Sequence, residues 1–275
     1  MTPLLLLAQE AVPTPVGDAE PSSGIAFWLV SLAVLSLAPF LLTVVTSFAK
    51  LVIVGGLLRQ ALGLQNTPPN SVITGLALLL TFTVMWPFVE DGVRAYRQLS
   101  AQSVATGEAA ADPDRAFASN LLAATQPNMH AFLERHASAR YVAFFDGLGE
   151  ARRDAHVPAP VPGLDPASPA ADDETLSEIA GGMLGLDPAL LDAARRDLTV
   201  YAPAFLLTEL TEAFQIGFLL FVPFLVIDLF VANVLLAMGM HMMQPTPISL
   251  PLKLLLFVVV SGWELIFRGL MLSYM

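Results

Sequence analysis

Six charged side chains lie in or beside long apolar stretches, and their placement asks for a chemical explanation. They are Glu209, Glu212, Asp228, Lys253, Glu264 and Arg268. An unpaired ionised group in apolar surroundings costs several kcal/mol, so each of them needs an opposite charge or water. A row of such carboxylates could carry protons, ions or a larger substrate across a membrane. The simpler alternative is that these groups pair between helices or subunits and thereby determine how the helices pack.

Methionines are concentrated in one segment, residues 238–251. Four of the ten methionines fall within six positions; they are Met238, Met240, Met242 and Met243. Gly239 and three prolines predict a helix break followed by irregular backbone. Methionine is unbranched and polarizable, so it repacks easily against different partners. The segment could be a loop tip that packs on a neighbour. If several copies surround an axis, it could instead form a deformable constriction that excludes water and ions.

Enzyme chemistry finds little support in the sequence. His130 and His136 are six residues apart, which suits neither one face of a helix nor a pair of metal ligands. Glu209 and Glu212 have the i, i+3 spacing of a di-iron helix, but the Glu-x-x-His sequence that would accompany them is missing. Nucleotide-binding and hydrolase motifs are absent as well. We therefore predict no catalytic residue, no metal, no cofactor and no enzymatic activity.

Four apolar blocks must position these residues. The chain has 275 residues, of which 55% are hydrophobic and 13% charged, so a single water-soluble globule is not expected. The blocks are Ile25–Ala49, Ser71–Val89, Ala213–Met238 interrupted by Asp228, and Leu254–Trp263 followed by Glu264 and Arg268. A helix of about 20 residues crosses a hydrocarbon layer of about 30 Å, and the first two blocks have that length without a charge. The pattern predicts two apolar helical hairpins.

The segment between the hairpins, residues 90–200, has a different composition. It contains 17 acidic and 9 basic residues, and most of the net charge of −11 lies there, which argues against nucleic acid as a partner. Asp112 and Asp187 each precede a proline, as helix N-caps often do, and Pro127–Leu148 has apolar residues at helical spacing. We predict a mostly helical aqueous domain with a mobile loop at the proline-rich stretch 157–173.

Orientation is predicted from the few cations in the short loops. Lys50 and Arg59 lie between the first two blocks, and Lys253 lies between the last two. Loops rich in lysine and arginine stay in the cytoplasm, so both termini and the acidic segment are expected on the outer side. Residues 1–24 form an N-terminal arm whose short apolar core has no cation before it, which makes it a poor secretory signal.

Two long stretches of the sequence are distinctive. Leu41–Pro87 contains TSFAKLVIV, LLRQALGLQNTPPN and LALLLTFTVMWP. Pro203–Tyr274 contains PAFLLTELTEAFQIGFLLFVPFLVIDLFVANVLLAMGM and then ISLPLKLLLFVVVSGWELIFRGLMLSY. Both stretches resemble the FliP/SctR family, core membrane proteins of the flagellar and virulence type III export apparatus. The closing GLMLSY is more similar to the virulence branch. The resemblance implies a bacterial inner-membrane protein whose acidic domain is periplasmic.

The resemblance also implies a function and a set of partners. Five copies would assemble with SctS/FliQ-like and SctT/FliR-like subunits into a closed, helical-like export gate, next to SctU/FlhB-like and SctV/FlhA-like subunits. Unfolded polypeptides would cross the membrane along its axis. The resemblance implies that Met240, Met242 and Met243 form a gasket around that axis. His241 interrupts this run of methionines, so the gasket is expected to be less apolar and sensitive to pH. The resemblance further implies an ion pair between Glu209 and Lys253.

We therefore predict an all-α protein with membrane-associated hairpins at 25–89 and 201–275 and a small helical periplasmic domain at 90–200. The resemblance implies that the apolar helices are buried against neighbouring subunits and that the protein is a pore-forming, non-enzymatic gate subunit. One alternative is a secondary transporter or proton channel that uses Glu209, Glu212, Asp228 and Glu264 as a relay. Another is a structural anchor whose acidic domain recruits an outer ring.

Overall fold

A computed structural model describes residues 32, 36, 37, 39–64, 67–107, 110, 112–155, 181 and 186–274. The chain divides into two compact units, residues 1–38 and 39–275, and all the helices named here belong to the second. The predicted N-terminal arm at 1–24 and the predicted mobile loop at 157–173 lie outside the described residues.

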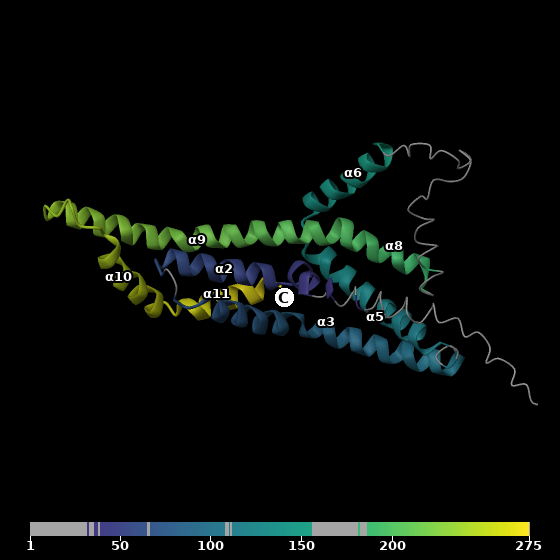
Figure 1. Cartoon of the computed structure of the whole chain (residues 1–275). Coiled ribbons are helices and arrows are strands. Elements are labelled where there is room, and N and C mark those ends of the chain that lie inside the picture. The colour runs from purple at the N-terminus through teal and green to yellow at the C-terminus, as the bar shows by residue number, and fades with distance from the viewer. Residues whose placement is uncertain are drawn as a thin grey trace, which may run out of the picture. The chain divides into compact units, whose positions relative to one another are not determined.

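Every regular element of the described residues is a helix, which confirms the predicted all-α fold (Figure 1). In chain order the helices are α2 (Phe48–Ala61), α3 (Asn70–Thr106), α5 (Pro113–His136), α6 (Ala139–Ala155), α8 (Pro188–Arg196), the π-helix η1 (Asp197–Tyr201), α9 (Ala202–Ala237), α10 (Thr246–Val259) and α11 (Gly262–Leu272).

The first hairpin is formed by α2 and α3. A short helix, Pro39–Val45, precedes α2 and is bent by 76° against it, so the first apolar block is not one straight helix. Leu51, Val54 and Leu58 of α2 are buried in the main apolar core. Helix α3 continues past residue 90 to Thr106, so the first hairpin and the acidic segment share one helix.

The two predicted N-caps in the acidic segment are confirmed. Helix α5 begins after Asp112, whose side chain accepts a hydrogen bond from the backbone N–H of Arg115 at 3.2 Å. Helix α8 begins after Asp187, which accepts from Ala189 N–H at 2.9 Å. Each carboxylate satisfies a backbone donor that the first helical turn leaves unpaired, so these starts depend on local sequence alone.

The helical spacing of apolar residues over Pro127–Leu148 corresponds to two helices, because the chain breaks between α5 and α6. Ala137 adopts an extended conformation, and Ser138 donates its backbone N–H to the hydroxyl of Thr208 on α9 at 2.9 Å. At this break a tertiary hydrogen bond takes the place of a helical one.

Asp228 interrupts the third apolar block in the sequence, but it does not break the helix. Helices α8, η1 and α9 run on from Pro188 to Ala237 as one element of 50 residues, with Pro223 and Asp228 inside it. The helix ends before Gly239, whose φ of 79° is the left-handed conformation that commonly terminates helices, so the break predicted there is confirmed.

The second hairpin returns through α10 and α11. Helix α10 begins at Thr246 with Pro247 in its first turn and Pro251 inside, so the irregular loop is shorter than the predicted 238–251. Proline fits the first turn because the N–H it lacks would have no helical acceptor there. Helices α10 and α11 are bent by 59° at Ser261, which has a positive φ of 52°.

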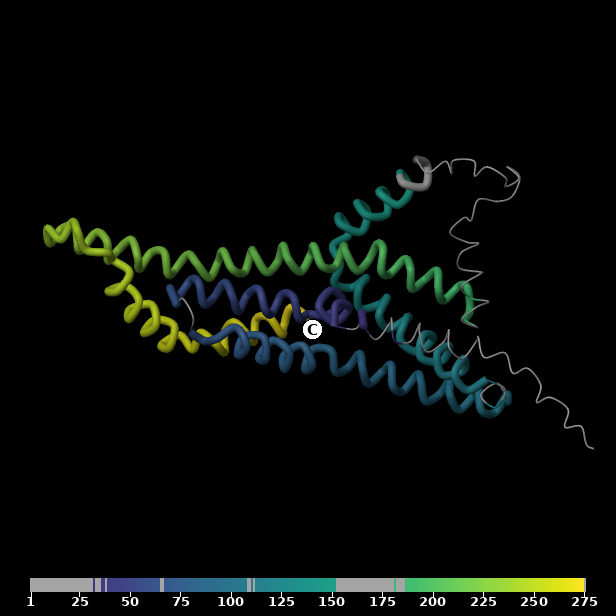
Figure 2. Tube along the Cα trace, in the orientation of Figure 1, coloured from purple at the N-terminus to yellow at the C-terminus, as the bar shows by residue number. Residues whose placement is uncertain are grey.

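Helix α9 packs along α2, and α10 returns from its far end (Figure 2). Helices α3 and α5 form the other extensive contact. By length and composition, α3 and the Pro188–Ala237 helix can each cross a membrane, and the two bent helix pairs raise the possible spans to four. Many large apolar side chains on these helices are exposed, among them Phe218 and Leu219 at 70% and 69%. Such a surface requires lipid or neighbouring subunits.

Candidate functional site

A buried lysine with two carboxylates lies between α2 and α9. Lys50 is 1% exposed, and its Nζ lies 2.6 Å from Glu212 Oε2 and 3.5 Å from Glu209 Oε2. Glu209 is 2% exposed, whereas the Glu212 side chain is 45% exposed. Because Glu209 is almost fully removed from solvent, its charge depends on Lys50 for compensation.

Tyr274, next to the C-terminal end, completes this cluster. Its hydroxyl donates a hydrogen bond to Glu209 Oε2, and Lys50 Nζ lies 4.6 Å from the centre of its ring. Burial of the hydroxyl raises the pKa of Tyr274 far above its usual value, and the negative charge of Glu209 raises it further. The tyrosine therefore stays a neutral hydrogen-bond donor, and the cluster ties the end of the chain to α2 and α9.

A second buried lysine joins α9 to α10. Lys253 is 5% exposed, and its Nζ lies 2.6 Å from Asp228 Oδ2 and 3.4 Å from the carbonyl oxygen of Ala61. This pairing explains why Asp228 is tolerated in the middle of an apolar helix. It fixes the base of the second hairpin, about 14 Å before the end of α9 at Ala237.

Within this chain the structure replaces the ion pair that the resemblance implied between Glu209 and Lys253. Glu209 faces Lys50, and Lys253 faces Asp228. The two acids lie 19 residues apart on one helix, about 28 Å along its axis, so a lysine that reaches Asp228 cannot also reach Glu209. The missed partner, Lys50, had a signal in the sequence, because it is a cation inside the apolar run TSFAKLVIV.

The remaining residues predicted as buried polar groups are less buried than expected. In the isolated chain Glu264 and Arg268 are exposed on α11, and Glu212 and Asp228 are partly exposed. Apolar neighbours in sequence predicted burial, but the other described residues leave these two side chains exposed.

The predicted methionine cluster lies at the tip where α9 turns back into α10 (Figure 1). The exposed fractions are 65% for Met238, 44% for Met240, 100% for Met242 and 53% for Met243. Exposing apolar side chains to water is unfavourable in free energy. The exposed methionine tip, residues 238–243, therefore has little cover from the other described residues.

A polar contact that sequence reasoning missed joins α5 to the π-helix η1. Asp197 is 4% exposed, lies 2.6 Å from His130 Nδ1, and accepts a hydrogen bond from Gln126 at 3.0 Å. A π-helix inserts a residue into a helical turn, and no periodicity in this sequence signalled it. Among the residues described, no three histidines or carboxylates come together as a possible metal site.

The fold and these contacts define an all-α, membrane-associated protein with paired buried charges and an apolar hairpin tip. The sequence profile of the FliP family matches residues 31–270, and the chain therefore belongs to the FliP family. Proteins of this family are components of the type III secretion export apparatus. The predicted family resemblance is confirmed.

Similar proteins come from both branches of the family. The "Hypersensitivity response secretion protein HrcR" of Ralstonia nicotianae is 39% identical over 90% of this chain and 95% of its own length. The "Yop proteins translocation protein R" of Yersinia pestis is 36% identical, over 90% of this chain and 94% of its own length. The "Flagellar biosynthetic protein FliP" of Caulobacter vibrioides is 36% identical over 99% of this chain and 85% of its own length.

Proposed function

We propose that this chain is a pore-forming subunit of a type III secretion export gate. In this proposal five copies, together with SctS/FliQ-like and SctT/FliR-like subunits, surround an axis along which unfolded polypeptides cross the bacterial inner membrane. SctU/FlhB-like and SctV/FlhA-like subunits adjoin the gate. The acidic segment, residues 90–200, lies on the periplasmic side. Family membership supports a place in the export apparatus, and the exposed apolar helix faces support contacts with other subunits.

The observation that carries the proposal is the exposed methionine tip. Met240, Met242 and Met243 stand at the end of the α9–α10 hairpin with much of each side chain exposed. If copies of this tip meet around an axis, their side chains cover one another and exclude water. Unbranched thioether side chains can then move apart for a polypeptide and close again. A constriction lined by the stiffer side chains of leucine or phenylalanine would do so less readily.

The buried ion pairs suit a hairpin whose base is rigid and whose tip moves. Lys253 and Asp228 join α9 and α10 below the tip at 2.6 Å, and Lys50 holds α9 against α2 further along. An exported chain that pushes the tips apart would therefore displace the loop at 238–245 rather than the hairpin as a whole. If the methionines form a gasket, closure of the axis depends on the loop at 238–245. Assembly of the gate depends on Lys50 and Lys253.

Two relatives named for pathogenicity or the hypersensitivity response support the virulence branch. The "Pathogenicity-related ORF2" of Xanthomonas campestris pv. glycines is 41% identical, and HrcR is 39% identical, against 36% for the flagellar protein of Caulobacter vibrioides. The closing GLMLSY supports the same assignment. We therefore place the gate in an injectisome rather than a flagellum.

The relay alternative is less well supported by the geometry. Glu209, Glu212 and Asp228 all lie within 3.5 Å of a lysine. Paired carboxylates of this kind hold helices together. Lys253 compensates the charge of Asp228, and Lys50 is shared by Glu209 and Glu212. A transporter would carry a small solute without partner subunits, whereas the gate requires them.

The gasket is tested by replacing Met240, Met242 and Met243 together with alanine in assembled gates. We expect a higher ion conductance across a bilayer that contains the closed gate, because the alanine side chains leave the axis open. Ile248→Ala is the matched control, since Ile248 is an exposed apolar residue of the same hairpin at 39%, just beyond the tip. Unchanged conductance in the triple variant, with assembly intact, would count against the gasket.

A further inference from the structure

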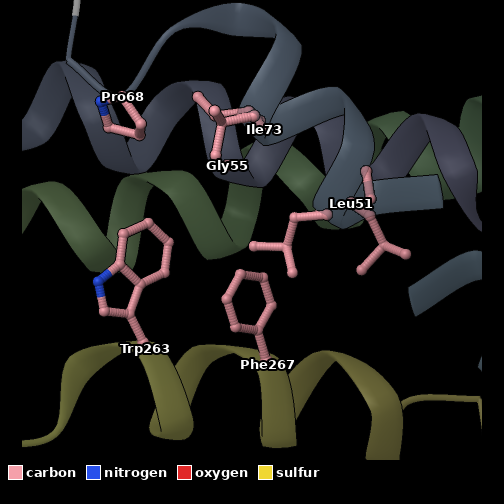
Figure 3. Close-up of a pocket in the computed structure, with 9 residues that line it drawn as sticks. Leu51, Gly55, Pro68, Ile73, Trp263 and Phe267 are labelled. Atoms are coloured by element: carbon pink, nitrogen blue, oxygen red, sulfur yellow. The ribbon is translucent and has the colours of Figure 1, made fainter. Parts of the chain in front are cut away.

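An apolar cavity of about 270 Å³ lies between α2, α3 and α11 (Figure 3). Leu51 and Gly55 of α2 form one wall, and Ile73 of α3 lies beside them. Trp263 and Phe267 of α11 point into the space from the opposite side, with their rings stacked 5.5 Å apart. Every residue that lines the cavity is apolar. Apolar cavities of about 150 Å³ bind molecules the size of benzene, so this one has room for a segment of hydrocarbon chain.

The cavity opens on the side of the molecule that carries exposed apolar residues. Val72 and Trp263 line it and are themselves 54% and 43% exposed. Val72 stands in the first turns of α3, one of the two helices long and apolar enough to cross a membrane. A hydrocarbon chain that runs beside α3 would therefore lie against residues that line the cavity.

A cation without a carboxylate partner among the described residues lies at the edge of the cavity. Arg59 donates from Nη1 to the carbonyl oxygen of Pro68, a lining residue, at 3.3 Å and to Asn70 Oδ1 at 2.6 Å. Its Nε is buried and has no partner among the described residues. The described ion pairs give Arg59 no carboxylate, so its charge is balanced by neutral oxygens alone.

We propose that this site binds an anionic phospholipid, with part of one acyl chain in the cavity and the phosphate on the Arg59 guanidinium. A purely apolar cleft with a single cation at its edge matches the two ends of such a molecule. Arginine binds phosphate well because its planar guanidinium presents several N–H donors at once. Clusters of cations between membrane helices are known to hold lipid head groups by the same chemistry. The bound lipid would hold α11 against the first hairpin.

The chemistry favours a lipid over a side chain from a second copy of this protein. An apolar side chain would fill the cavity but leave the Arg59 charge without an anion. A carboxylate would satisfy Arg59 but has no hydrocarbon long enough to occupy the space beneath Trp263. An amphiphile with a negative head group satisfies both at once.

The site is tested by the fluorescence of Trp263, which lines the cavity and serves as its reporter. The chain has three tryptophans, so Trp28→Phe with Trp86→Phe leaves Trp263 alone. This full-length chain is reconstituted into phosphatidylcholine vesicles that contain rising fractions of brominated phosphatidylglycerol or, in a parallel series, brominated phosphatidylcholine. Bromine quenches tryptophan on contact, so quenching reports which lipid lies against Trp263.

We expect half-maximal quenching at roughly fivefold lower fractions of phosphatidylglycerol than of phosphatidylcholine, the selectivity that one cation near a lipid head group supplies. Arg59→Gln should abolish this preference. Asn70→Ala removes the same loop contact but keeps the cation, so it should retain the preference. Equal quenching by both lipids, or equal loss in both variants, would overturn the assignment of the phosphate to Arg59.

Occupation of the cavity is tested separately by narrowing its mouth. Val72→Phe adds a ring where the chain would enter, and it should weaken quenching by both lipids. Leu78→Phe adds the same ring at an exposed position of α3 that does not line the cavity, and it should change nothing. If Val72→Phe and Leu78→Phe behave alike, the lipid reaches Trp263 from the bulk membrane and the cavity is not a binding site.

Discussion

Replacing Lys50 by methionine tests whether the buried charges hold α2 and α9 together. Methionine is close to lysine in length and is apolar, so the packing of α2 changes little while the cation disappears. Glu209, which is 2% exposed, then keeps a negative charge without compensation. Removing one partner of a buried ion pair costs about 3 to 5 kcal/mol.

An independent estimate gives the same magnitude. The cheapest escape for Glu209 is to take up a proton, and protonating an ordinary glutamate at pH 7 costs about 3.7 kcal/mol, since its usual pKa is about 4.3. Glu212 contributes little to the penalty because its side chain is 45% exposed and water can solvate it. We therefore expect Lys50→Met to lower the free energy of unfolding by about 3 to 4 kcal/mol at pH 7.

The measurement is denaturant unfolding of the purified chain in mild detergent, for Lys50→Met, Glu209→Gln and the double variant. Glu209→Gln should cost less than Lys50→Met, because Lys50 keeps Glu212 at 2.6 Å. The double variant should recover part of the loss, and acidification to about pH 5 should reduce the penalty of Lys50→Met to about 1 kcal/mol. Additive, pH-independent effects would refute the reasoning.

Lys253→Met is the natural comparison for that series. Its partner Asp228 has a side chain that is 36% exposed, so the abandoned carboxylate remains partly hydrated. The loss should be smaller than for Lys50→Met, about 1 to 3 kcal/mol. A larger loss at Lys253 than at Lys50 would mean that burial does not control these pairs.

Four further outcomes concern Gly217, Gly56 and Tyr274. Gly217→Ala should destabilise the chain by about 1 to 3 kcal/mol, because the new Cβ would lie 2.3 Å from Leu57 Cδ1. Gly56→Ala should instead stabilise α2 by about 0.5 to 1 kcal/mol, because no atom lies within 4 Å of the new Cβ. Tyr274→Phe should cost about 1 to 3 kcal/mol by removing the donor to Glu209, as denaturant midpoints would show. Since the pKa of Tyr274 is raised in the folded chain, stability should fall as pH rises above about 10, where unfolded tyrosine ionises, and a flat profile there would contradict its burial.

Local signals in the sequence predicted the helix ends well. Asp112 and Asp187 start helices, and Gly239 follows the end of one, because each of these residues acts on its own turn of backbone. The start of α10 at Thr246 was missed because several prolines close together indicate a break, although the first turn of a helix accepts proline.

Contacts between distant segments could not be predicted in the same way. The break before Ser138 depends on the hydroxyl of Thr208, and the pairing of Lys50 depends on how α2 and α9 align. Composition predicted that the buried charges need partners, which is a general physical requirement. The identity of each partner follows from the packing, and family resemblance suggested a different one for Glu209.

The central claim, that methionine tips of neighbouring copies meet around an axis, is tested most directly by cysteine cross-linking. The chain contains no cysteine, so Met242→Cys introduces its single thiol, at a side chain that is fully exposed in the isolated chain. Disulfides require Cα atoms within about 7 Å. We predict that oxidation of the assembled complex in native membranes joins chains in pairs through residue 242, whereas Phe144→Cys, exposed on α6, gives none. A complex that assembles with several copies but yields no cross-link at 242 would contradict the account.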